Sequence, residues 1–139
     1  MKSPAPRPCE SCPYRRDVPS GVWAAEEYDK LRDFDDQHGA RMTALFYCHQ
    51  HDADDERSRL CAGWVGCHGH SSIGLRIAVA SGRVSRTVFE YESPVPLFAS
   101  GAEAADHGQA DIADPSEDAA RLIDKITANR PSVDAGDQR

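Results

Sequence analysis

The stretch expected to decide the fold is Pro8-Cys9-Glu10-Ser11-Cys12-Pro13-Tyr14-Arg15, in which two cysteines are separated by two residues. Two thiolates at this spacing can bind one metal ion from a single tight turn, and two further ligands complete a tetrahedron. The remaining cysteines are Cys48, Cys61 and Cys67, and five of the six histidines also lie within the first 70 residues. This concentration of metal-binding side chains in one half of a 139-residue chain predicts a metal site.

Cys48 and Cys61 are the expected partners of Cys9 and Cys12, because both are flanked by apolar or aromatic residues that would bury the site. A four-cysteine set suits a structural Zn²⁺ ion, and it also suits a [4Fe-4S] cluster. Cys48 and Cys61 are too far apart in the sequence to be the second Cys-x-x-Cys of a zinc ribbon. Three other side chains are alternatives for one of the four positions: Cys67, His49 and His68.

The composition is that of one globular domain, with 40% hydrophobic and 28% charged residues. The net charge of −7 is spread evenly along the chain, and a chain without a basic stripe is a poor candidate for binding nucleic acid. No apolar run is long enough to span a bilayer, and the N-terminus lacks the apolar stretch of a secretory signal. We therefore expect a cytoplasmic protein, where clustered cysteines more often bind metal than form disulfides.

The expected fold is a small single α+β domain, in which several short helices surround a minimal sheet and a metal site ties the N-terminal half together. Residues 1–8 are expected to form a flexible arm, 9–130 a single metal-binding domain, and 131–139 a flexible tail. Helices are predicted over residues 21–34 with Ser20 as N-cap, over 58–67, over 72–80, from Ser100 to Gly108, and after Asp114 as N-cap and Pro115. The last helix is expected to be amphipathic, with Ala119, Leu122, Ile123 and Ile126 on its apolar face. A strand is predicted over 44–48, and residues 83–92 are predicted to be a strand or an extended loop.

Several stretches of this chain resemble a group of small, uncharacterised cysteine-rich proteins of high-GC bacteria and their phages. The matching stretches are residues 8–15, Pro19-Ser20-Gly21-Val22-Trp23, Phe46-x-Cys48-His49, Cys61-Ala62-Gly63-Trp64 and Pro96-Leu97-Phe98-Ala99-Ser100-Gly101. The resemblance covers the chain from residue 8 to about 130. It supports the Cys9, Cys12, Cys48 and Cys61 set but implies no activity.

A looser similarity is to the WhiB-like iron–sulfur regulators, which also place a Gly-Val-Trp turn after their cluster cysteines, as Gly21-Val22-Trp23 does here. This chain departs from them in its cysteine order and in its acidic C-terminal half. Ala24-Ala25 also stands where those regulators have two glycines after the tryptophan.

Three functional hypotheses follow from these patterns. The first is a cytoplasmic protein with a closed, structural four-cysteine zinc site that acts as an interaction or regulatory module with a protein partner. The second is a redox or gas-sensing regulator that carries a [4Fe-4S] cluster on the same cysteines. The third is a small enzyme with an open metal site, which needs an acid such as Asp17 or Asp52 beside the metal. It is the least favoured, because no known catalytic motif is present and no catalytic residue is assigned.

Overall fold

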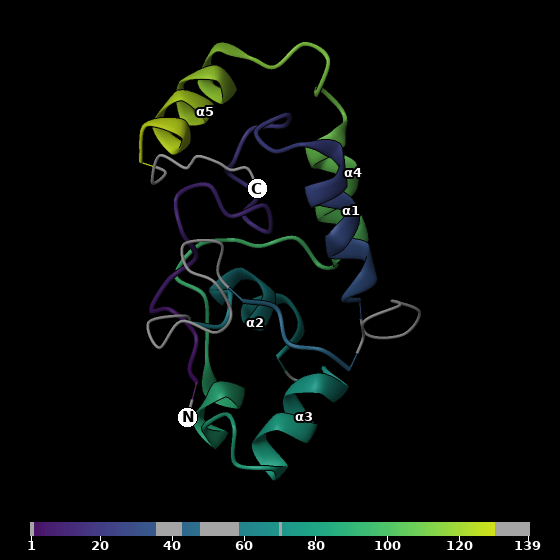
Figure 1. Cartoon of the computed structure of the whole chain (residues 1–139), viewed down its shortest axis with the longest axis vertical. Coiled ribbons are helices and arrows are strands. Elements are labelled where there is room, and N and C mark those ends of the chain that lie inside the picture. Colours follow the sequence, from purple (N-terminus) through teal and green to yellow (C-terminus); the bar gives the residue numbers. More distant parts are fainter. Residues whose placement is uncertain (1, 36–42, 48–58, 70, 130–139) are drawn as a thin grey trace.

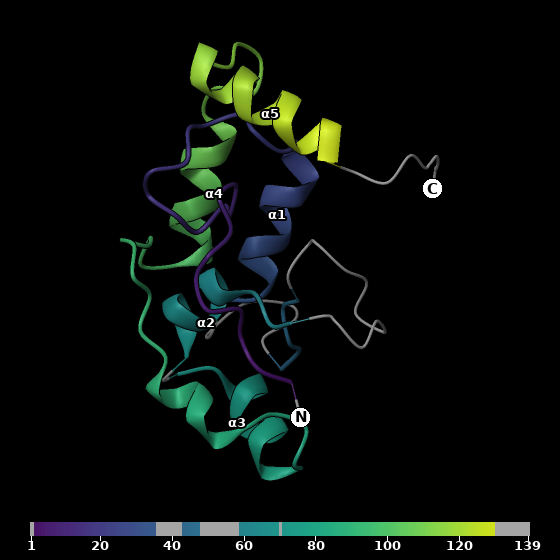
Figure 2. The ribbon, with the colours of Figure 1, turned by 90° about the vertical axis from the view of Figure 1, so that its left-hand side faces the viewer.

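The computed structural model describes residues 2–35, 43–47, 59–69 and 71–129. These parts contain five α-helices and one 3₁₀ helix: α1 (Ala25–Asp33), α2 (Ala62–His68), α3 (Ile73–Ala80), η1 (Arg86–Glu90), α4 (Gly101–Gln109) and α5 (Glu117–Asn129). Helices α1 and α4 lie side by side, α5 and α3 lie at opposite ends of the long axis, and α2 lies between α3 and the α1–α4 pair (Figure 1, Figure 2). None of the helices in these described ranges has the length and apolar composition needed to cross a membrane.

The structure confirms a small single domain, and the domain is mainly helical. Pairing between extended segments consists, over the described ranges, of isolated bridges only. Leu60 takes part in two of them, with Pro4 in parallel and with Tyr47 in antiparallel orientation. The strand predicted over 44–48 is thus a single bridge at Tyr47, and Cys48 lies outside the described residues.

The first two predicted helices begin later than expected, because tertiary contacts occupy their start positions. Ser20 does not cap α1, since its hydroxyl donates to the Gly108 carbonyl (3.0 Å) and accepts from the Asp111 amide (2.8 Å). Helix α1 therefore begins at Ala25 without a side-chain cap. Helix α2 begins at Ala62, with Cys61 as its N-cap residue and not inside the helix, because the Cys61 amide donates to the Phe46 carbonyl (2.9 Å).

The later helices are closer to prediction. The Ser72 hydroxyl accepts from the Leu75 amide, as expected for the start of α3, and the Ser100 hydroxyl accepts from the Glu103 amide at the start of α4. Helix α4 ends at Gln109, one residue beyond the predicted stop. Residues 83–92 were expected to be extended, but they contain η1, whose first turn is capped by Ser85.

Helix α5 begins two residues after Pro115, with the Ser116 hydroxyl accepting from the Ala119 amide in the place predicted for Asp114. Its apolar face forms a small cluster, separate from the main core, with residues that precede α1. This cluster contains Val18, Val22 and Trp23 from the N-terminal segment and Ala119, Leu122, Ile123 and Ile126 from α5. The predicted amphipathic face of the last helix is therefore confirmed.

Two glycines allow α1 and α4 to pack closely in antiparallel orientation. A methyl group at Gly101 would overlap the Leu31 carbonyl, and one at Gly108 would overlap the Tyr28 ring. Gly101 and Gly108 are seven residues apart and lie on one face of α4, so that the α1 backbone approaches Gly101 directly and the Tyr28 ring packs against Gly108. Tyr28 and Leu31 are in turn fully buried, and they form part of the main core.

Gly108→Ala tests this close packing, because the packing decides whether the change raises or lowers the free energy of unfolding. In a solvent-exposed helix, replacing glycine by alanine gains about 1 kcal/mol. Here the added methyl overlaps the Tyr28 ring, so the free energy of unfolding should fall by about 1–3 kcal/mol. Urea unfolding followed by circular dichroism measures this free energy. In a Tyr28→Leu background the same change should cost less, and an equal cost would show that the ring is not the obstacle.

Candidate metal centre

The centre of the candidate site is a pair of buried sulfur atoms from distant parts of the chain. Cys12 Sγ lies 4.0 Å from Cys61 Sγ, and the two residues are 1% and 5% exposed. Cys12 ends a turn in which its amide donates to the Cys9 carbonyl (3.0 Å), and Cys61 is held at the start of α2 by its bond to Phe46. Two of the four predicted ligands are therefore brought together, although 48 residues separate them in the sequence.

The 4.0 Å separation suits two ligands of a single ion. Two sulfur atoms bound at 2.3 Å to one tetrahedral zinc ion lie roughly 3.8 Å apart. The cysteines of a [4Fe-4S] cluster each bind a different iron atom, which spreads their sulfurs more widely. The distance between Cys12 and Cys61 is close to the zinc value.

Cys9 is the third sulfur of this region. It is half-buried, and its thiol interacts with that of Cys12 and lies 3.8 Å from the Ser11 hydroxyl. In the described parts of the chain, no group of three or more histidine, cysteine, aspartate or glutamate side chains is arranged to hold a metal ion by itself. Cys48 and the alternative ligand His49 fall outside the described residues, so the structure places three of the four predicted cysteines.

Opposing influences act on the pKa of the Cys12 thiol. The hydrogen bond with Cys61 raises it, and burial and the nearby Cys61 charge add to this, so that the pKa is well above its ordinary value. Cys9 and the backbone N–H of Tyr14 act in the opposite direction, because both favour the thiolate. Without a metal ion Cys12 is thus a protonated thiol, and binding of zinc would release its proton.

Helix α2 presents a glycine, Gly63, directly beneath the Cys12 sulfur. A methyl group at this position would overlap Cys12 Sγ and would lie 2.9 Å from Tyr14 Cβ. The segment from Cys12 to Tyr14 therefore sits directly on the first turn of α2. The Cys-Ala-Gly sequence at residues 61–63 thus supplies a sulfur and the space for a second one.

The alternative ligands Cys67 and His68 lie at the other end of α2 and belong to a different set of contacts. His68 is buried, and its Nε2 lies 3.2 Å from Asp35 Oδ1 and 3.7 Å from Cys67 Sγ. The Asp35 carboxylate also accepts the Gly101 and Ala102 amides at the start of α4 (2.7 and 3.0 Å). In a Cys–His–Asp triad the thiol and the carboxylate contact opposite ring nitrogens, whereas here both lie against Nε2. The arrangement therefore serves to join α2 to α4.

Two further polar groups are buried near these elements. The Tyr14 hydroxyl and the Trp64 indole nitrogen have no hydrogen-bond partner among the described residues, although both side chains are almost completely buried. Burial, followed by the charges of Cys61, Cys67 and Asp35, raises the pKa of Tyr14 well above its ordinary value. Tyr14 also packs edge-on against Phe46 and His68, so it lies between the segment that precedes Cys48 and the far end of α2.

Tyr14→Phe tests whether this hydroxyl is unpaired. A buried polar group without a partner costs about 1–3 kcal/mol, so removing only the oxygen should raise the free energy of unfolding of the metal-free protein by about 1 kcal/mol. Chemical denaturation in the presence of a chelator measures the difference. Tyr28→Phe is the matched control, because the Tyr28 hydroxyl accepts the Val22 and Trp23 amides (both 3.1 Å) and its loss should destabilise the protein. Destabilisation by Tyr14→Phe would show that its hydroxyl is hydrogen-bonded.

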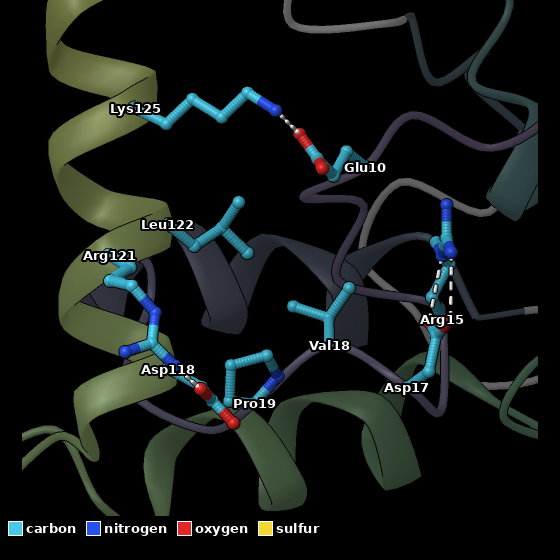
Figure 3. A pocket seen from close by; sticks show the side chains of 9 residues that line it. All are labelled: Glu10, Arg15, Asp17, Val18, Pro19, Asp118, Arg121, Leu122 and Lys125. Carbon is cyan, nitrogen blue, oxygen red and sulfur yellow. Dashed lines mark hydrogen bonds and ion pairs between the residues drawn. The ribbon is translucent and has the colours of Figure 1, made fainter.

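A surface pocket of about 310 Å³ lies between residues 10–19 and α5 (Figure 3). Its apolar lining is Val18, Pro19 and Leu122, and its charged lining consists of three ion pairs: Arg15–Asp17, Arg121–Asp118 and Lys125–Glu10. Each cation in the pocket is therefore matched by a carboxylate. Glu10 belongs to the Cys9–Cys12 turn, so its 2.6 Å contact with Lys125 links α5 to that turn.

The charges of the sequence favour a salt bridge from Arg15 to Asp17 or Glu10 over a bound phosphate, and the structure confirms the Arg15–Asp17 pair (2.7 Å). The contacts of Asp35 were not predicted. Asp35 follows α1, but its partners come from α2 and α4, so no local sequence pattern indicates them. The helical spacing of Trp23, Leu31 and Phe34 predicts a core position for Trp23. Its indole N–H also donates to the Ser11 carbonyl (2.9 Å), inside the predicted ligand turn.

Comparison with known proteins gives one match. Residues 4–130 match the model of a family described as a family of unknown function, DUF6283. No curated protein and no solved structure matches the chain significantly. The expected membership of an uncharacterised family is confirmed, and the match provides no link to the WhiB-like regulators.

Proposed function

The chain belongs to DUF6283, a family of unknown function, and we propose that it is a metal-binding protein whose thiolates hold one structural zinc ion. The observation that carries this proposal is the 4.0 Å separation of Cys12 Sγ and Cys61 Sγ. Cys9, whose thiol lies against that of Cys12, is the third proposed ligand. Cys48, outside the described residues, is the fourth proposed ligand on the sequence argument.

The surroundings of the sulfur pair support a closed, structural site. Cys12 and Cys61 are buried, and Gly63 gives the Cys12 sulfur room against α2. A backbone N–H, that of Tyr14, is already directed at the Cys12 sulfur and would stabilise its thiolate. An ion held here would join the N-terminal turn to the start of α2, and zinc bound in this way adds about 10 kcal/mol to folding in zinc-finger peptides.

A catalytic role for the ion has less support. An open site needs a carboxylate or a water beside the metal. Asp17, one of the acids that the sequence offered for this role, is held by the Arg15 guanidinium through two hydrogen bonds (2.8 and 2.7 Å). We therefore propose a non-enzymatic, cytoplasmic protein in which the metal site supports a surface that binds a protein partner.

The test is elemental analysis and a visible spectrum of protein purified without oxygen. The expected result is one zinc ion per chain and no colour. About four irons per chain with acid-labile sulfide and absorbance near 400 nm would contradict zinc and favour the [4Fe-4S] alternative. A wild-type protein without metal would contradict both.

Cysteine substitutions identify the ligands. Cys12→Ser and Cys61→Ser should lose the bound zinc and lower the melting temperature, because each removes a buried thiolate of the proposed site. Cys67→Ser is the matched control, because Cys67 lies at the opposite end of α2 beside His68, and it should keep the zinc. Retention of one zinc ion by Cys12→Ser or Cys61→Ser would exclude that residue as a ligand.

A further inference from the structure

The carbonyl groups of the Cys9–Cys12 turn are bound from outside the turn. Arg15 Nη1 donates to the carbonyls of Pro8 and Cys9 (3.3 Å each), and the Trp23 indole N–H donates to the carbonyl of Ser11 (2.9 Å). A further bond closes the turn itself, from the Cys12 amide to the Cys9 carbonyl. The backbone that carries two of the proposed ligands is thus shaped by side chains that follow it in the sequence.

Arg15 is itself held in place. Its Nε and Nη2 atoms donate to the two carboxylate oxygens of Asp17 (2.8 and 2.7 Å), which is the bidentate geometry of a strong arginine–carboxylate pair. The Arg15 side chain is only 14% exposed, although Asp17 is 54% exposed. With four hydrogen bonds made by its guanidinium, Arg15 is oriented toward the turn before any ion arrives.

We propose that Arg15 is a positioning residue of the metal site, which pre-forms the Cys9–Cys12 turn. This inference rests on the proposed function, because it takes those thiolates to be metal ligands. Groups that orient metal ligands from outside the coordination sphere typically contribute 10–100-fold to metal affinity. Arg15 acts through the backbone of the turn, and not as a ligand.

The experiment compares the zinc dissociation constants of Arg15→Gln and Arg16→Gln, measured by competition with a chromophoric chelator. Arg16 is the matched control, because its bonds go to the Leu97 carbonyl and to Glu103, away from the turn. Arg15→Gln should weaken zinc binding by about tenfold or more, and Arg16→Gln by no more than about twofold. Arg15→Lys, which keeps the charge but lacks the planar fork, should fall between the two. Equal affinities for Arg15→Gln and Arg16→Gln would overturn the inference.

If Arg15→Gln does not fold, the zinc affinity of Asp17→Asn provides the test. This variant leaves the guanidinium in the protein but removes the carboxylate that orients it, so zinc affinity should fall by about threefold to tenfold. An unchanged affinity would overturn the inference. A wild-type chain that binds no metal would refute the proposed function and the role of Arg15 with it, whereas wild-type binding that Arg15 variants leave unchanged would refute only the role of Arg15.

Discussion

The contact between the Cys9–Cys12 turn and the first turn of α2 is the interaction on which the rest of the structure depends. The Cys12 sulfur lies over Gly63 and against the Cys61 sulfur, so the two segments are in direct contact. The residue before Cys61, Leu60, forms bridges to both Pro4 and Tyr47. Three segments that are distant in the sequence therefore meet at one sulfur pair, and an ion bound there would fix all three at once.

The polar groups around this contact differ in what they contribute. The Arg15–Asp17 pair is bidentate and its arginine is mostly buried, so it has the geometry in which an ion pair contributes to structure. The Lys125–Glu10 pair is exposed at both ends, and exposed pairs contribute at most about 1 kcal/mol. Helix α5 is therefore held mainly by its apolar cluster with the segment before α1.

A second polar junction lies at the far end of α2. Asp35 accepts hydrogen bonds from two amides at the start of α4, and its Oδ1 lies 3.2 Å from His68 Nε2, so one carboxylate connects the end of α1 with α2 and α4. A carboxylate near the N-terminus of a helix is also favoured by the helix dipole. The buried Tyr14 hydroxyl beside this junction lacks a partner among the described residues.

The sequence by itself determined the helical stretches whose signals are local. Ser72 and Ser100 cap the helices that follow them, and the apolar face of residues 119–126 packs as its periodicity predicted, because caps and periodicity act over one or two turns. Only the tertiary structure decided the start of α1, where Ser20 bonds to α4 in place of its own helix. The tertiary structure also decided that Cys12 contacts Cys61 and that Asp35 contacts His68. In both cases the two partners come from segments that no local sequence pattern connects.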